Sequence, residues 1–269
     1  MKRIGGSDLK KIQIEILDTV AQFCDANGIR YWLDSGTLLG AIRHKGYIPW
    51  DDDIDLGMLR EDYDRFISCF NESNDRYRVV CIENHPDFYC SFAKVCDTTT
   101  VLYEPDENGH KLSVNIDIFV YDNAPDDDRL VKKMYDRRDR LRTISEYKTD
   151  PINRKEKLKS ILRLERRTVC RICFPQNTVR LMAENSKKYA DCKTERVGNF
   201  TAYTRMTCSK RVFDSFVDVE FEGKKYKAPV GYDEWLRSFY GDYMQLPPVE
   251  KRVTHHAFIA YRKETQENG

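Results

Sequence analysis

The chain has 269 residues, with 45 Lys and Arg against 44 Asp and Glu, and its formal net charge is +1. This length fits one large domain, or one domain with an insertion, and a hydrophobic content of 41% is enough for a globular core. No stretch approaches the roughly 18 consecutive apolar residues of a membrane span, and residues 1–6 lack the apolar segment of a secretory signal.

The nine cysteines form no paired CxxC array of the kind that binds zinc. Cys170 and Cys173 make one CxxC within a helical pattern, which we interpret as helix packing. An odd number of cysteines without a signal peptide favours a reducing compartment. We therefore expect a cytoplasmic protein, with a peripheral position at the inner membrane face as an extension of that expectation.

Residues 1–120 alternate between helical and strand patterns. Ser7–Asp8 cap a predicted helix that ends at Asn27–Gly28, and a strand follows at 29–34. Residues 38–43 open a second helix, and a third begins at Arg60. Further strands are predicted at 77–82, 88–95, 99–103 and 114–120.

The rest of the chain is predicted to be helical before it returns to the sheet. Residues 125–190 carry helical patterns, 219–226 have the pattern of a hairpin, and 232–240 form a short helix. We therefore predict an α/β (α+β) fold, with a mixed sheet, packed helices and a helical insertion in a single domain over 1–269. Its expected parts are a core sheet at 29–120, the helical insertion at 125–195 and a completing segment at 200–260.

Four aspartates lie within the five residues 51–55. Such a cluster repels itself, and the pKa values of its members rise unless a cation neutralises them. Asp53 and Asp55 alternate with apolar residues, which predicts a strand with both acids on one face, and Asp117 lies between two isoleucines in a later strand. Two such strands side by side would hold three carboxylates around Mg²⁺ or Mn²⁺.

We therefore predict Asp53, Asp55 and Asp117 as the catalytic and metal-binding residues. If the strand starts early, Asp51 lies on the same face as Asp53, so it is an alternative ligand. The proline and tryptophan just before it indicate that the chain is still turning there, and we place Asp51 and Asp52 beside the ligands. Because the acids repel one another, replacing any one of the three is expected to leave the apo protein at least as stable.

Ser35, Gly36 and Thr37 form a small-residue turn between a predicted strand and a predicted helix. A helix N-terminus after a tight turn presents free backbone N–H groups to an anion. Phosphate next to Mg²⁺ next to carboxylates is the arrangement that moves a phosphoryl or nucleotidyl group. The turn, the acid pair and a third acid on a later strand together resemble the nucleotidyltransferase fold.

The full run from Leu33 to Asp55 resembles the LicD family, which includes phosphocholine transferases and the fukutin-related sugar-modifying enzymes. Further matching segments follow in order at 94–100, 115–119, 240–248, Arg252 and His255–His256. The resemblance implies a Mg²⁺-dependent transferase that takes a CDP-alcohol as donor and passes the phospho-alcohol to a glycan hydroxyl, releasing CMP. Phosphocholine is the default cargo, and the glycan acceptor is expected on the cell surface or on a lipid-linked precursor.

Several cationic residues are candidates for contact with substrate phosphate. Within the family pattern we choose Arg43 first, because its planar fork can bind phosphate bidentately. Lys94 lies in an apolar strand, where an unpaired ammonium is costly, so it either pairs with a site carboxylate or binds phosphate. The remaining substrate contacts that the resemblance implies are Lys45, Arg252, His255 and His256.

A choline group would call for an aromatic cage. The sequence offers four aromatic residues for it without placing them: Trp32, Tyr47, Trp50 and Tyr103.

Residues 129–167 are strongly basic, with 15 Lys and Arg against 6 Asp and Glu. They lack the interleaved aromatics of a single-stranded nucleic-acid platform, so no nucleic-acid partner is expected. Two interpretations stay open. The block is either a solvated helical face or a peripheral contact with an anionic membrane surface or an anionic, lipid-linked acceptor.

Other functions compete with phospho-alcohol transfer. The same three acids would serve a nucleotidyltransferase, which moves a nucleoside monophosphate and releases pyrophosphate. A DxD glycosyltransferase needs neither the turn at 35–37 nor a third acid on a separate strand, and a non-enzymatic binding module has no need of a complete acid set. We rank these two behind the transferases.

Overall fold

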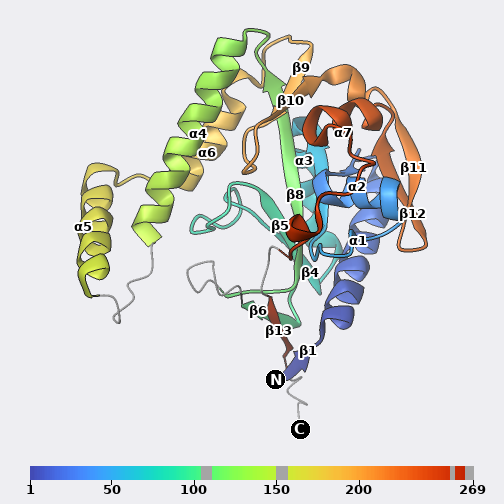
Figure 1. Cartoon of the computed structure of the whole chain (residues 1–269), viewed down its shortest axis with the longest axis horizontal. Helices are drawn as coiled ribbons and strands as arrows, with labels where there is room; N and C mark the ends of the chain where they lie inside the picture. Colours follow the sequence, from blue (N-terminus) through green and yellow to red (C-terminus); the bar gives the residue numbers. More distant parts are fainter. Residues whose placement is uncertain (104–110, 150–156, 255–257, 264–269) are drawn as a thin grey trace.

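The computed structural model describes residues 1–103, 111–149, 157–254 and 258–263 (Figure 1). Within these residues the chain has an α/β fold, with a seven-stranded sheet, a four-stranded sheet and a two-stranded hairpin. None of the helices in this part of the chain is both long and apolar enough to cross a membrane.

The seven-stranded sheet is organised around its longest strand, β8, which runs vertically through the centre of Figure 1. Its strands are β2 (Trp32–Leu33), β3 (Asp55–Leu59), β4 (Tyr77–Val80), β5 (Ala93–Asp97), β8 (Asn115–Ala124), β9 (Arg196–Asn199) and β10 (Met206–Ser209). Strand β8 pairs in parallel with β3 and antiparallel with β5, and its far end pairs antiparallel with β9. Strand β8 therefore connects β3, which begins at the end of the acidic segment, with β5 and with the much later β9.

Three helices pack against this sheet: α1 (Gly6–Asn27), α2 (Ser35–His44) and α3 (Arg60–Ser73). Helix α1 buries Ile12, Ile16 and Val20 at helical spacing and ends at Gly28, whose φ of 60° is left-handed. Phe23 of α1 meets two phenylalanines of α3 edge to face. These contacts fix α1 beside the acidic segment.

The basic region forms a separate group of helices at the left of Figure 1: α4 (Asp128–Thr149), α5 (Lys157–Cys173) and α6 (Thr178–Ser186). Helices α4 and α6 pack side by side, and α5 contacts α4 at the outer edge. A 3₁₀ turn, η1 (Lys187–Tyr189), then leads toward β9.

The C-terminal part closes the fold around α2. It contains η2 (Lys210–Phe213), the hairpin strands β11 (Phe216–Phe221) and β12 (Lys224–Pro229), helix α7 (Tyr232–Tyr240) and η3 (Val249–Lys251). The hairpin tip reaches the end of α2, where the Glu222 carboxylate accepts a hydrogen bond from the backbone N–H of Tyr47 at 3.0 Å. The hairpin therefore braces the loop that leads into the aspartates.

The four-stranded sheet lies at the bottom of Figure 1, where the first strand of the chain pairs with the last described one. Its order is β1 (Lys2–Ile4), β13 (Ile259–Arg262), β6 (Thr100–Tyr103) and β7 (Lys111–Leu112). The sequence patterns predicted neither β1 nor β13, and they placed β6 in the main sheet, which is wrong.

Most predicted elements are present, but several boundaries near the site differ. Helix α2 begins at Ser35 instead of Leu38, so the predicted turn is the first turn of the helix. Strand β3 begins at Asp55, so Asp53 lies before it. The cause is α1, because Lys10 and Gln13 donate to the carbonyls of the first two aspartates and hold that backbone away from the ladder. The main sheet also extends beyond 29–120, since 196–209 supply β9 and β10.

Candidate active site

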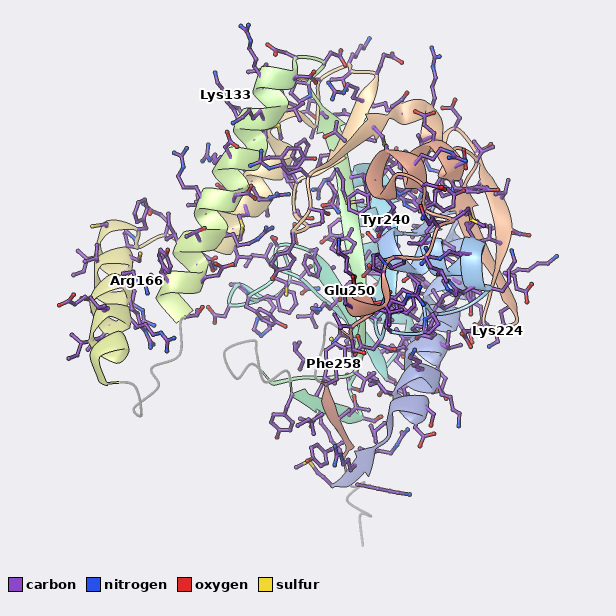
Figure 2. The ribbon with its side chains drawn as sticks, in the orientation of Figure 1. Lys133, Arg166, Lys224, Tyr240, Glu250 and Phe258 are labelled. Carbon is purple, nitrogen blue, oxygen red and sulfur yellow. The ribbon has the colours of Figure 1, made fainter. Side chains whose placement is uncertain are left out.

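The aspartates lie at the junction of two cavities. The larger, of about 700 Å³, lies between α2, α7 and the loops around them, and the smaller, of about 160 Å³, lies against β5 and β8. Four residues line both: Asp53, Asp55, Phe119 and Tyr203. Figure 2 labels Tyr240 from the wall of the larger cavity and Phe258 from the wall of the smaller one.

Asp51, Asp52 and Asp53 form the tightest acidic group among the described residues. Each offers a carboxylate oxygen, and these oxygens lie within 4.8 Å of one another, which is close enough to hold one cation. The Asp51 carboxylate packs on the first turn of α2, where a Cβ on Gly36 would come within 2.7 Å of its Oδ2 atom. The structure thus gives Asp51 and Asp52 a larger part than the sequence patterns did.

Asp55 and Asp117 face each other as register partners at the start of β3 and on β8. Asp55 keeps part of its surface open to the cavity. Loss of water contact raises its pKa well above the usual range, and repulsion from Asp53 and Asp117 raises it further. This local excess of negative charge is what a bound cation would relieve.

Lys94 pairs with a carboxylate of the site, which is the first of the two roles that the sequence left open. Its Nζ atom lies 2.7 Å from Oδ1 of Asp117 and 3.3 Å from the side-chain oxygen of Asn115. Lys94 on β5 and Asp117 on β8 are register partners, and both line the smaller cavity. The side chain of Lys94 therefore balances the charge of one member of the predicted acid set.

The first turn of α2 borders the larger cavity through Ser35 and Gly36. Ser35 has a φ of 46°, a left-handed conformation that is uncommon for a residue with a side chain. Thr37 points inward, and its hydroxyl accepts a hydrogen bond from the backbone N–H of Asp55 at 2.8 Å. Two of the three predicted turn residues thus face the cavity, and the third fixes the position of an aspartate.

Arg43 lines the larger cavity and also binds the C-terminal loop on the opposite side of it. Its Nη1 atom donates to the carbonyl of Tyr243 at 2.7 Å and to that of Gln245 at 3.4 Å. Burial lowers the pKa of this guanidinium, and the nearby charge of Arg252 lowers it further. Arg43 therefore connects the α2 side of the cavity to the C-terminal loop.

The other predicted phosphate contacts are scattered. Lys45 is exposed at the end of α2 and is absent from the lining of both cavities. Arg252 donates to the carbonyl of Pro247 at 2.8 Å, and its guanidinium lies 5.6 Å from the ring centre of Trp50 at the cavity wall. His255 and His256 lie outside the described residues.

Of the four aromatics considered for a cage, only Trp50 lines the larger cavity. Trp32 and Tyr47 are buried in the core, and Tyr103 lies in the four-stranded sheet. The aromatic residues that do line this cavity with Trp50 are Phe119, Tyr203, Phe239, Tyr240 and Tyr243.

A loop that the sequence patterns missed, at 202–204, also borders the larger cavity. Two arginines of α4 hold its backbone: Arg138 donates to the carbonyl of Thr204 at 2.7 Å, and Arg142 donates to that of Ala202 at 2.7 Å. The Arg142 guanidinium also lies 4.3 Å from the ring centre of Tyr203. These two residues of the basic block are therefore used inside the protein, which corrects their assignment to an outer face.

Comparison with known proteins agrees with this geometry. Residues 28–157 match the family described as LicD/FKTN/FKRP, nucleotidyltransferase domain. The lipopolysaccharide cholinephosphotransferase LicD of Haemophilus influenzae is 32% identical over 270 residues, which cover 97% of this chain and 99% of that protein. The chain belongs to the LicD family. The resemblance seen in the run from Leu33 to Asp55 is thereby confirmed.

Other LicD relatives match over shorter segments. The human ribitol 5-phosphate transferase FKRP is 60% identical over 38 residues, 14% of this chain and 8% of that protein. The human ribitol-5-phosphate transferase FKTN is 39% identical over 54 residues, 20% of this chain and 12% of that protein. The named relatives all transfer a phospho-alcohol, and this chain is a phosphotransferase of the LicD type.

Proposed function

We propose that the chain transfers a phospho-alcohol, phosphocholine by default, from a CDP-alcohol to a hydroxyl of a cell-surface glycan or its lipid-linked precursor. The acceptor oxygen forms a new bond to the phosphorus that carries the alcohol, the bond from that phosphorus to the bridging oxygen breaks, and CMP leaves. The observation that carries the proposal is the position of the aspartates between two cavities, next to the N-terminus of α2.

A divalent cation fits the acidic group. Asp51, Asp52 and Asp53 offer oxygens at cation-binding separation, and burial together with neighbouring carboxylates raises the pKa of Asp55 beside them. Hard carboxylate oxygens are what Mg²⁺ and Mn²⁺ prefer. Bound there, the cation would supply charge neutralisation for the two donor phosphates and for the CMP leaving group.

The larger cavity suits the nucleotide donor. Its volume of about 700 Å³ is typical of small-molecule sites. Ser35 and Gly36 bring the first turn of α2 to its wall, and the N-terminal turn of a helix favours phosphate. Arg43 adds a fixed positive charge on the same side, because its hydrogen bonds to Tyr243 and Gln245 orient the guanidinium.

We assign the acceptor hydroxyl to the side of Asp117. Asp117 lines the smaller cavity, which meets the donor cavity at Asp53 and Asp55. A carboxylate at this junction can accept the proton of the attacking hydroxyl. Lys94 holds that carboxylate through a 2.7 Å ion pair and so fixes its direction.

Phosphocholine is favoured as cargo over ribitol phosphate by two observations. The full-length relative is a cholinephosphotransferase, whereas the ribitol-phosphate transferases match over short segments. The larger cavity also combines the rings of Trp50, Phe239 and Tyr240 with carboxylates. Aromatic faces together with negative charge attract a quaternary ammonium.

The test is a donor panel of CDP-choline, CDP-ribitol, CDP-glycerol and ATP with Mg²⁺. Thermal shift reports binding, and chromatography identifies the released CMP or pyrophosphate. We expect the largest shift from CDP-choline and CMP as the product. An Asp53→Asn variant should lose CMP release while Asp126→Asn, at an exposed site, keeps it. Pyrophosphate release from the triphosphate without CMP would favour nucleotidyl transfer instead.

A further inference from the structure

Helix α5 packs on the protein through its polar side. Its half-buried residues Arg163, Arg167 and Cys170 recur at helical spacing and share one face. Two further arginines hold α4: the Arg166 guanidinium lies 4.7 Å from the ring centre of Tyr147, and Arg171 donates to the carbonyl of Lys148 at 3.2 Å. The inward side of α5 therefore carries Arg163 and Arg167, while Arg166 and Arg171 stay exposed at its edges.

The opposite side of α5 is apolar and faces outward. Ile161, Leu162, Val169 and Ile172 form one stripe, and their exposed fractions are 55%, 53%, 58% and 74%. Glu165, the one acid of α5, lies within this stripe. An amphipathic helix on a globular protein normally buries its apolar face, so the reversed orientation leaves a surface that calls for an apolar partner.

Charge selects the partner. Helix α5 contains six Lys and Arg and a single Glu. Figure 2 labels Arg166 on α5 and Lys133 on α4, both at the outer edge of the molecule. A second copy of this surface would bring cations against cations, whereas an anionic lipid surface accepts both the apolar stripe and the charge.

We propose that α5 lies in the interface of an anionic membrane, with Ile161, Leu162, Val169 and Ile172 among the lipid chains. Basic side chains at the edges of the helix then meet the lipid headgroups. This surface is separate from the two cavities, so the attachment does not depend on the proposed reaction. It would keep the catalytic domain at a membrane surface without any spanning helix.

The first experiment measures co-sedimentation with phosphatidylcholine vesicles that contain, or lack, one quarter phosphatidylglycerol. The parent protein should bind the anionic vesicles, and the triple variant Ile161→Gln, Val169→Gln, Ile172→Gln should bind them at least tenfold more weakly. A matched variant, Val217→Gln with Val230→Gln, removes exposed apolar side chains near the hairpin at the other side of Figure 1 and should bind like the parent.

The second experiment uses a Leu162→Trp variant and detects insertion directly, as a change in fluorescence. Insertion predicts a blue shift of the new tryptophan emission on anionic vesicles and its quenching by brominated lipid chains. The proposal is overturned if the parent fails to sediment with anionic vesicles or if the emission does not change. It is equally overturned if sedimentation equilibrium shows a dimer that the triple Gln variant abolishes while neither protein binds vesicles.

Discussion

Lys94 and Asp117 form an ion pair across neighbouring strands, with 2.7 Å between Nζ and Oδ1 and side chains only 9% and 15% exposed. This pair divides the acidic residues into two kinds. Asp117 is balanced by a neighbouring ammonium, whereas Asp55 carries a pKa raised by burial and by its acidic neighbours. The sequence patterns had treated the three predicted acids alike.

The first prediction is that these two acids respond oppositely to replacement. Asp117→Ala removes the carboxylate bonded to buried Lys94 and should lower the free energy of unfolding by about 2 kcal/mol. Asp55→Asn removes a repelled charge and should leave the apo protein unchanged or up to about 1 kcal/mol more stable. Both should lower turnover by about 100-fold or more. Urea unfolding and CMP release measure the two effects, and a destabilised Asp55→Asn would contradict the assignment.

The second prediction concerns Asp34, at the N-cap of α2. Burial raises its pKa to about 6, although a hydrogen bond from the Tyr121 hydroxyl opposes the shift. The folded state therefore holds this proton more tightly than the unfolded state. Its contribution to stability is complete below the ordinary pKa near 4 and is lost as the pH rises through about 6.

Replacing Asp34 by Asn should remove that loss. Asn keeps an acceptor for Tyr121 and is an equally good N-cap. Between pH 5 and pH 7.5, the drop in the free energy of unfolding should be smaller than in the parent by about 1.4 kcal/mol. Chemical denaturation of the apo protein at a series of pH values measures this, and parallel curves for the two proteins would refute the buried carboxylate as the cause.

The third prediction is that Arg142 positions the loop at 202–204. Arg142→Ala removes its hydrogen bond to Ala202 and its contact with the ring of Tyr203, so the loop should lose its fixed place at the cavity. We expect kcat/KM to fall about tenfold with little change in melting temperature. Arg140→Ala, at an exposed position on the same helix, is the control. Equal kinetics for the two variants would show that the loop needs no such support.

The fourth prediction is a requirement for a divalent cation. Excess EDTA should abolish turnover, and Mg²⁺ or Mn²⁺ should restore it. Ca²⁺ should support donor binding better than turnover, because it is larger and coordinates more loosely than Mg²⁺. Isothermal titration and CMP release separate the two effects. Undiminished activity in EDTA would show that the acidic group works without a metal.

The sequence predicted the pairing of Asp55 with Asp117 because both lie in strands whose apolar neighbours must enter the core. The alternation also suggested that Asp53 belonged to the strand, but side chains of Lys10 and Gln13 on α1 bind the carbonyls of the two residues before it. Such a competition between a helix and a strand ladder depends on tertiary contacts. Local periodicity carries no information about it.

Two other features depend on contacts between distant segments. The loop at 202–204 reaches the cavity because Arg138 and Arg142, 66 and 60 residues before the carbonyls that they bind, hold its backbone. Helix α5 shows the limit of pattern reasoning most clearly. Its apolar stripe would normally predict an inward face, whereas the half-buried residues of this helix include Arg163 and Arg167 on the opposite side.

The most direct test of the proposed reaction is to follow both halves of the donor in one assay. CDP-choline with one radiolabel in the cytidine and a different one in the choline would be incubated with the protein, Mg²⁺ and lipopolysaccharide that lacks phosphocholine. Phospho-alcohol transfer predicts the choline label on the glycan and the cytidine label in CMP, with both products lost in Asp53→Asn. Appearance of the cytidine label on the glycan would contradict it.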